Sequence, residues 1–280
     1  MNCPNCNGTN LVCKKRVEVT KDYIKSDLMH CNDCDILFLC NPTWLINAYE
    51  ESFSCDTGHV IRNNSLASKT ILYFRIWQII NRTADFEKCL DLGTGIGIFP
   101  RLMRDKGYLF YGFDEFSSMS LIKPFIASDE MMSKIKIKTS FEVIEHIPSL
   151  PSFLREKVGD VNLFLFSTEL RDVGKIPNLN WDYYNFEVGQ HISFHSIKSL
   201  KIAFKKEGYD PDRIFSFGKS LHVLANTRKW IIAFRLARII WKINLLFEKL
   251  QKILLNLIFK EKSLTQSDFS YSKKLIKNIR

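Results

Sequence analysis

A loop with glycines at alternate positions constrains the fold of this chain more than any other feature. It lies in the run Cys89-Leu90-Asp91-Leu92-Gly93-Thr94-Gly95-Ile96-Gly97-Ile98-Phe99. Because glycine has no β-carbon, the backbone of such a loop can turn tightly and pass close to a ligand. An apolar run before the loop and a helical pattern after it are typical of a strand, a turn and a helix in a nucleotide-binding α/β sheet. The alternative is a turn that only joins a strand to a helix.

Two acidic residues accompany this loop. Asp91 lies two residues before Gly93, and its carboxylate would repel the pyrophosphate that a Gly-x-Gly-x-x-Gly loop binds. A carboxylate suits a cationic ligand with an amino group and a sulfonium, which favours S-adenosylmethionine over NAD. Asp114 follows the next predicted strand, about twenty residues beyond the loop, where an acid can accept hydrogen bonds from both ribose hydroxyls.

Strand-like and helix-like stretches alternate from residue 88 to residue 226, which predicts an α/β sheet of seven strands or slightly fewer with helices on both faces. The predicted strands are 88–92, 109–113, 135–140, 161–167, 213–217 and 221–225, and the predicted helices are 65–83, 98–106, 150–157 and 197–207. We expect three parts: an N-terminal module over 1–60, the α/β domain over 61–226 and a helical tail over 227–280.

Two Cys-x-x-Cys pairs near the N-terminus predict a metal site. Cys3 and Cys6 form the first pair, and Cys31 and Cys34 form the second. Four thiolates on two tight turns complete the tetrahedral set that structural zinc prefers, with no open position for catalysis. A module this small buries too little core to fold alone, so zinc would supply the missing stability. A redox pair and unpaired thiols are the alternatives.

Charge is concentrated in the tail. The chain of 280 residues has a net charge of +10, and residues 219–280 hold 14 basic and 3 acidic side chains, so the remainder carries about −1. A near-neutral body disfavours nucleic acid as a partner. A basic, apolar tail points to an anionic membrane surface, to packing on the domain or to a homodimer contact. The first residues contain no apolar secretory segment, which predicts a cytoplasmic protein, peripheral to the inner membrane face if the tail binds lipid.

Further motifs follow two of the predicted strands. The loop and Asp114 resemble the first motif and the ribose-binding acid of class I S-adenosylmethionine-dependent methyltransferases. The segment Phe141-Glu142-Val143-Ile144-Glu145-His146-Ile147 resembles an F-E-V-x-E-H segment in one branch of that superfamily, and the similarity continues in Phe166-Ser167-Thr168-Glu169, in Trp181, in Tyr183-Tyr184 and in Gly189-Gln190-His191-Ile192-Ser193-Phe194. This branch is often associated with bacterial polysaccharide and sugar-modification gene clusters.

The resemblance covers roughly residues 1–225, and its motifs are specific for the superfamily and the cofactor but weak for the substrate. It implies a Rossmann-like methyltransferase sheet and an enzyme that binds S-adenosylmethionine. The implied cofactor-binding residues are Asp91, Gly93, Gly95, Gly97, Asp114 and Phe141. The chain departs from the family's pattern after Asp114, because no clear third strand ends in an acid that could hold the adenine amino group. Apolar contacts around Phe116 could hold the adenine instead.

Glu145, His146 and His191 are the candidate catalytic residues. Methyl transfer to a hydroxyl requires alignment of donor and acceptor and removal of a proton, for which a neutral histidine is suited. We therefore expect His146 or His191 to be the base, with Glu145 orienting it. A divalent cation at Glu142, Glu145 and His146 is an alternative, as in the similar terminal 2′-O-methyltransferases of small RNAs. A purely structural role as a helix cap is another.

Aromatic and polar residues between Trp181 and His191 suggest a carbohydrate acceptor, because aromatic rings stack on sugars while amide, imidazole and carboxylate groups bind hydroxyls. The sequence thus predicts O-methylation of a saccharide or another small sugar-containing acceptor, in polysaccharide biosynthesis. RNA terminal 2′-O-methylation with a metal site and a non-catalytic zinc-bearing scaffold are the rival hypotheses.

Overall fold

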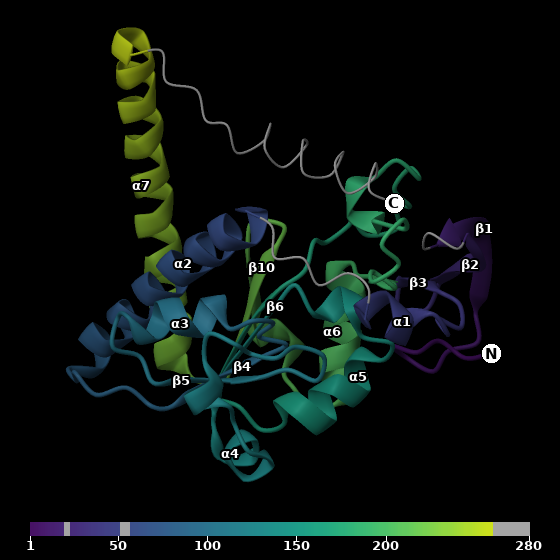
Figure 1. Cartoon of the computed structure of the whole chain (residues 1–280), viewed down its shortest axis with the longest axis horizontal. Helices are drawn as coiled ribbons and strands as arrows, with labels where there is room; N and C mark the ends of the chain where they lie inside the picture. Colours follow the sequence, from purple (N-terminus) through teal and green to yellow (C-terminus); the bar gives the residue numbers. More distant parts are fainter. Residues whose placement is uncertain (20–22, 51–56, 260–280) are drawn as a thin grey trace.

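The computed structural model describes residues 1–19, 23–50 and 57–259. Its centre is a six-stranded sheet in the order β5-β4-β6-β7-β10-β9 (Figure 1). The strands are β4 (Cys89–Leu92), β5 (Phe110–Phe113), β6 (Ile137–Phe141), β7 (Leu163–Ser167), β9 (Ile214–Phe217) and β10 (Leu221–Ala225). The first four of this order run parallel, and β10 is antiparallel to both of its neighbours. The structure thus confirms the predicted α/β sheet and each of its strands to within two residues.

Apolar side chains on both faces of the strands explain why helices cover the sheet on two sides. Along β7, Leu163 and Leu165 point to one face, and Phe164 and Phe166 point to the other. The first face is covered by α2 (Thr57–Asn81), α3 (Ile98–Arg104) and α7 (Arg228–Phe259), and the second by α4 (Asp129–Lys134), α5 (Leu150–Phe153) and α6 (Ile197–Lys206). Single turns lie at Lys123–Phe125, Ile144–His146, Leu154–Val158, Asp182–Tyr184 and Pro211–Arg213.

The outer edge of β5 has little further pairing. Within the described ranges, only an isolated bridge between Gly112 and Ile126 continues the sheet there. This agrees with the sequence, which has no clear third strand after Asp114.

A second sheet joins the N-terminal module to the main domain. Its strands are β1 (Leu11–Val19), β2 (Ile24–Cys31), β3 (Leu37–Leu39) and β8 (Ser193–Phe194), in that order, and helix α1 (Leu45–Glu50) follows β3. The backbone N–H of Leu39 also donates to the carbonyl of Ile192, at 2.9 Å. Because β8 belongs to the segment that leads into α6, the module and the main domain share one sheet.

A buried ion pair fastens the same junction. The Arg171 guanidinium lies 3.0 Å from the Asp35 carboxylate, and His30 lies 2.9 Å from it, with all three side chains almost fully buried. Burial would raise the pKa of Asp35, but hydrogen bonds from Ser196, His30 and Arg171 lower it to about 2. A buried charge pair of this kind is costly to break, because either partner alone would be left without compensation.

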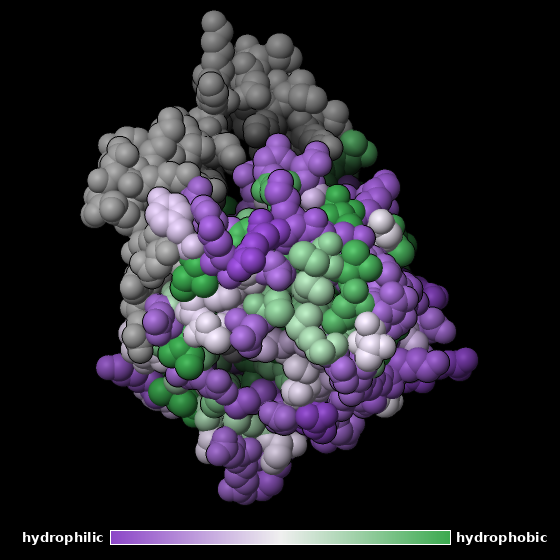
Figure 2. Space-filling view, turned by 90° about the vertical axis from the view of Figure 1, so that its right-hand side faces the viewer, coloured by the Kyte–Doolittle hydropathy of each residue, from purple (hydrophilic) through white to green (hydrophobic). Residues whose placement is uncertain are grey.

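The N-terminal sheet has a hydrophilic edge strand. Strand β1 is the edge strand, and its exposed residues include Lys14, Lys15 and Arg16. Figure 2 looks onto this side of the molecule and shows hydrophilic residues around a patch of apolar ones. Charged side chains on an edge strand discourage pairing with other chains.

The predicted N-terminal helix over 65–83 begins earlier, at Thr57, and ends at Asn81. The predicted tail helix is confirmed as α7, which runs past α2 and projects beyond the body of the molecule (Figure 1). Residues 260–280 of the predicted tail lie outside the described residues. The domain boundaries at 60 and 226 stay a prediction.

Candidate functional site

The glycine loop connects β4 to α3 in a conformation that requires glycine. Gly93, Gly95 and Gly97 have φ angles of +70°, +59° and +94°, in the left-handed region that other residues rarely adopt. A β-carbon at Gly93 would lie 2.4 Å from a methyl group of Val143, and one at Gly97 would lie 2.5 Å from Ile122. Backbone conformation and packing against the neighbouring segments therefore both exclude larger residues.

Asp114 lies at the end of β5, beside the loop. Its Oδ2 accepts a hydrogen bond from the Gly95 N–H at 2.7 Å, and its Oδ1 accepts from the N–H groups of Phe116 and Ser117 at 2.8 Å each. A carboxylate offers about four acceptor positions, so one is left for a ligand hydroxyl. Three backbone groups thus hold Asp114 in place with room for one hydroxyl of a ribose, and its predicted contact with both ribose hydroxyls stays a prediction.

Asp91 lies beneath the loop rather than at its surface. Its side chain is buried, and the Thr139 hydroxyl donates a hydrogen bond to its Oδ1. Burial raises the pKa of Asp91 to about 7, although Thr139 and Thr94 oppose the shift, and the nearby Asp114 charge adds to it. A cation above the loop would favour the ionised form. Direct contact between Asp91 and a ligand stays a prediction.

Replacing Asp91 with asparagine is expected to stabilise the free protein at high pH. The pKa in the folded chain is raised from 3.8 to about 7, so the unfolded chain loses its proton first and stability falls as pH rises through this window. The full loss, above about pH 7, is on the order of 4 kcal/mol, because one pKa unit corresponds to about 1.4 kcal/mol. Asparagine does not ionise, so Asp91→Asn should resist urea better than the unmodified chain at about pH 8 and equally well at about pH 4. A difference that is independent of pH would contradict this explanation.

Glu145, His146 and His191 come together at the carboxyl end of β6. Glu145 and His146 lie in the turn that follows this strand, and His191 lies two residues before β8. One potential ligand atom from each of the three lies within 4.8 Å of the others. The two imidazole rings meet edge to face, with centroids 4.9 Å apart. The structure therefore places the three predicted catalytic residues in one cluster.

A hydrogen bond to the backbone defines the tautomer of His191, and both histidines are neutral. Nδ1 of His191 lies 2.6 Å from the carbonyl oxygen of Tyr183, so it carries the proton and donates. Burial lowers the pKa of His191, against the opposing effects of this hydrogen bond and of Glu142. Burial and His191 lower the pKa of His146 well below its usual value, although a hydrogen bond to the Gln190 backbone opposes them. Both rings are therefore neutral near pH 7, and Nε2 of His191 carries a lone pair.

Glu145 is a fully buried carboxyl group. Burial raises its pKa to about 8, the Glu142 charge adds to the shift, and the hydroxyls of Tyr183 and Thr168 oppose it. Among the described residues, neither of its carboxyl oxygens has a hydrogen-bond partner at normal geometry. A buried carboxylate is costly unless it is protonated or paired with a cation. The group is suited either to hold a proton or to bind a positive charge.

Glu142 is already paired and stands apart from this cluster. Its Oε1 accepts from the Ser167 hydroxyl at 2.7 Å, and its Oε2 accepts from Arg62 at 3.0 Å. Its φ of +56° turns the chain sharply at the end of β6. The predicted cation site at Glu142, Glu145 and His146 stays a prediction, and the potential ligand atoms that lie together in the structure are those of Glu145, His146 and His191. The contact with Arg62 does not follow from the sequence, because nothing in the sequence indicates that α2 reaches this turn.

The predicted acceptor segment contributes one wall of the site. The rings of Tyr183 and His191 lie 4.8 Å apart, and Trp181 lies 5.2 Å from Tyr183. The Tyr183 hydroxyl receives a hydrogen bond from the backbone N–H of Glu169 and lies 2.9 Å from the Thr168 hydroxyl. Tyr184, in contrast, is fully buried in the core beneath the N-terminal sheet. Of the two adjacent tyrosines, Tyr183 therefore faces the histidines and Tyr184 packs the fold.

Phe141 ends β6 and packs against α3. Its ring lies 4.7 Å from that of Phe99, edge to face. It is partly buried, at the edge of the apolar cluster that also contains the first residues after the loop. Its predicted contact with a cofactor stays a prediction.

The four cysteines form a compact cluster. The Cys3 and Cys34 sulfurs lie 3.5 Å apart, and those of Cys6 and Cys31 lie 3.6 Å apart, with all four within 4.8 Å of one another. Ligands about 2.3 Å from a tetrahedral zinc ion would be about 3.8 Å from each other, close to these spacings. The N–H of Gly8 donates to the Cys6 sulfur at 3.3 Å, an arrangement that orients a thiolate ligand. The donor set therefore fits zinc.

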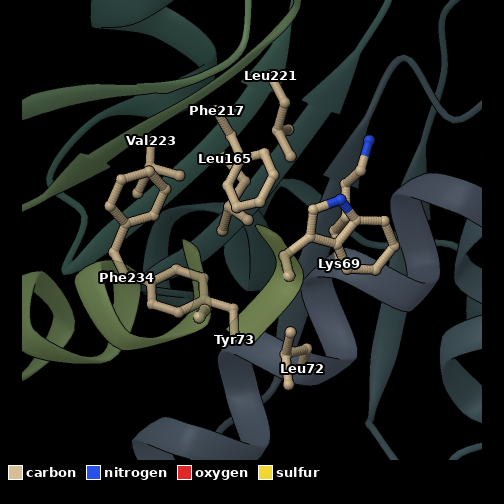
Figure 3. A pocket seen from close by; sticks show the side chains of 10 residues that line it. Lys69, Leu72, Tyr73, Leu165, Phe217, Leu221, Val223 and Phe234 are labelled. Carbon is tan, nitrogen blue, oxygen red and sulfur yellow. The ribbon is translucent and has the colours of Figure 1, made fainter. Parts of the chain in front are cut away.

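One apolar pocket lies away from these residues. It is lined by side chains of α2, α7 and the sheet strands that they cover, and Lys69 is its one charged lining residue (Figure 3). The Lys69 ammonium lies 5.4 Å from the Trp241 ring centre, and burial lowers the pKa of this lysine. The pocket is separate from the glycine loop and the histidines.

Comparisons with known proteins identify the family of the main domain. A family model described as "Methyltransferase domain" matches residues 64–213. The fold is similar to that of magnesium protoporphyrin IX methyltransferase from Synechocystis PCC 6803 with bound S-adenosylmethionine, at 11% identity and a TM-score of 0.37, over 64% of this chain and 88% of that one. It is also similar to mitomycin 7-O-methyltransferase (14% identity, TM-score 0.39, 66% and 61% coverage) and to a possible histamine N-methyltransferase from Thermotoga maritima (12%, 0.38, 65% and 96%). No curated protein matches the sequence.

Proposed function

Because the chain belongs to the methyltransferase domain family, we propose that it methylates a hydroxyl oxygen of a saccharide or sugar-containing acceptor. The chain is an S-adenosylmethionine-dependent methyltransferase. The chemical nature of its acceptor and the roles of its catalytic residues are proposals. The cluster of Glu145, His146 and His191 beside Tyr183 supports it most directly. It provides neutral imidazoles and an aromatic wall at the edge of the sheet where the glycine loop lies.

Residues around the loop would hold the methyl donor. Asp114 has one acceptor position left for a ribose hydroxyl, and the left-handed glycines allow the backbone to approach the ligand. Asp91 would balance the positive charge of the donor's amino acid part from below. When bound, S-adenosylmethionine supplies an electrophilic methyl group on a sulfonium.

His191 is the better placed of the two candidate bases. Its Nδ1–H is fixed on the Tyr183 carbonyl, so Nε2 presents the lone pair that can accept the proton of an acceptor hydroxyl. The depressed pKa keeps this lone pair available at neutral pH. Glu145, at the same cluster, would orient the imidazole. Trp181 and Tyr183 would stack on the faces of a sugar ring.

A divalent cation at Glu145, His146 and His191 is a second candidate for the same cluster. Its support is the buried Glu145 carboxyl, whose oxygens have no hydrogen-bond partner of normal geometry within the part of the chain that the structure describes. An imidazole that donates to a backbone carbonyl, as His191 does, is also typical of a metal ligand. Such a cation would hold two neighbouring hydroxyls, including those of a terminal ribose in RNA. The near-neutral charge of residues 1–218 favours a saccharide over nucleic acid.

Zinc at the four cysteines is a further part of the proposal. The sulfur spacings and the N–H from Gly8 support it. This ion would be structural, because four thiolates leave no coordination position for a substrate.

Methyl transfer from radiolabelled S-adenosylmethionine to fractions of a cell lysate would test the acceptor class. We expect label in the glycan or sugar-nucleotide fraction, and incorporation should disappear with the Asp114→Ala variant as control. Label confined to RNA would favour the cation-dependent alternative. Labelling of neither fraction, by a protein that binds S-adenosylhomocysteine in calorimetry, would reject both acceptors while leaving the donor site intact.

A further inference from the structure

Helix α7 has an apolar face that points away from the domain. Its inner face packs on α2 and the sheet through Trp230, Ala233, Phe234 and Ala237, which are buried. A different row is exposed and recurs at helical steps of one, three and four residues: Ile232, Leu236, Ile239, Ile240, Ile243 and Phe247. Phe247 is 66% exposed and Ile239 is 55% exposed. An exposed row of large apolar residues on a monomer is unusual and indicates an interaction surface.

Basic residues follow this row along one side of the helix. Arg235, Arg238 and Lys242 are exposed, and they too recur at steps of three and four residues. Between Arg228 and Phe247, the helix contains five basic residues and no acidic residue. The residues from 219 onward have a net charge of +11. The face is therefore apolar with a positively charged margin.

The helix is also positioned so that a flat surface could reach it. It extends past α2 and projects beyond the body of the molecule, so its outer part is not recessed between other elements (Figure 1). At the point where it leaves the body, Trp241 packs edge to face on Phe217, and the Lys69 ammonium lies over the Trp241 ring. These two contacts fix α7 to the domain at the point where the helix begins to project.

We propose that the apolar row of α7 lies in the surface of an anionic lipid bilayer, with Arg235, Arg238 and Lys242 at the phosphate groups. Lipid explains both features, because acyl chains take up the apolar row while anionic headgroups neutralise the margin. A second copy of the chain would bring like charges together, since this stretch offers no acidic residue to pair with them. No helix among the described residues is long and apolar enough to cross a bilayer. The helix would therefore lie in the interface plane.

Flotation of the full-length protein with lipid vesicles tests the proposal. We expect binding to vesicles of phosphatidylcholine with phosphatidylglycerol, little binding to phosphatidylcholine alone, and weaker binding at high salt. Ile243→Gln should reduce affinity for the anionic vesicles about tenfold, because a buried isoleucine is worth roughly that factor. Asn244→Gln is the matched control. It is exposed on the same turn but lies off the apolar row, so it should bind like the unmodified chain.

Two results would overturn the proposal. One is equal binding by the Ile243→Gln and Asn244→Gln variants. The other is a dimer in sedimentation equilibrium that Ile243→Gln dissociates, which would assign the apolar row to a second copy. Binding of S-adenosylhomocysteine serves as the folding control for each variant, because α7 contributes no residue to the glycine loop.

Discussion

Replacing Cys31 with serine is expected to release zinc from the N-terminal module and to abolish methyl transfer. Structural zinc sites contribute about 10–16 kcal/mol of apparent binding free energy in small modules, so losing one thiolate should unfold most of this one. Cys31 ends β2, and its N–H bonds to the Ile36 carbonyl in the turn that leads to β3. The loss of zinc would therefore disorder both strands.

The effect on activity follows from the shared sheet. Strand β3 pairs with β8, and Ile192, which directly precedes β8, donates its N–H to the carbonyl of Glu145. His191 lies one residue further back, so disorder in β3 would displace the histidine from its cluster. Zinc content, thermal melting and kcat should all fall together in Cys31→Ser.

Cys13→Ser provides the control for this experiment. Cys13 is exposed and lies outside the four-cysteine cluster, so this variant should keep its zinc and its activity. Full activity in a zinc-free Cys31→Ser protein would show that the module does not support the catalytic cluster.

Replacing His191 with alanine should reduce kcat by about 10²- to 10⁴-fold, the usual contribution of a general base. Donor affinity should stay unchanged, because His191 comes from the segment before β8 and not from the glycine loop. Rapid-quench measurement of a single turnover would give the chemical step, and calorimetry with S-adenosylhomocysteine would give the donor affinity. His59→Ala, at an exposed histidine on α2, should behave like the unmodified enzyme.

The dependence of kcat on pH, together with removal of metal, distinguishes a histidine base from a catalytic cation. The pKa of His191 is lowered, so a neutral base predicts a kcat that is flat at neutral pH and falls only below the ordinary histidine value of about 6.5. A catalytic cation predicts instead that dialysis against metal-free buffer removes activity, that Mn²⁺ restores it, and that Glu145→Gln no longer binds Mn²⁺. An unchanged kcat in His191→Ala would show that His191 acts neither as the base nor as a ligand of a catalytic cation.

Much of the α/β domain could be predicted because its signals are local. The apolar strands and the glycine loop each depend on residues close together in the chain. The donor side could be predicted for the same reason: Asp114 and the loop lie at the ends of adjacent parallel strands, so their proximity follows from the strand order. The cysteine pairs have a spacing that already specifies their geometry.

The rest depends on contacts between distant segments. His191 could be named from its motif, but its distance from Glu145 depends on the pairing of β3 with β8. The buried pair of Asp35 with Arg171 and the partly exposed pair of Glu142 with Arg62 join residues that carry no mutual signal in the sequence. A short strand such as Ser193–Phe194 has no periodicity from which it could be detected. Tertiary packing alone decides these features.

The pairing of β3 with β8 also imposes an order of events during synthesis. Both Cys-x-x-Cys pairs are complete once residue 34 has been synthesised. Strand β8, which pairs with β3, is synthesised only after residue 192. At about 5–20 residues per second, the ribosome needs on the order of 10 to 30 seconds to supply it. During this interval the nascent module would expose an unpaired strand to other chains. Zinc bound early to the four cysteines would keep β1, β2 and β3 folded on each other until β8 leaves the ribosome.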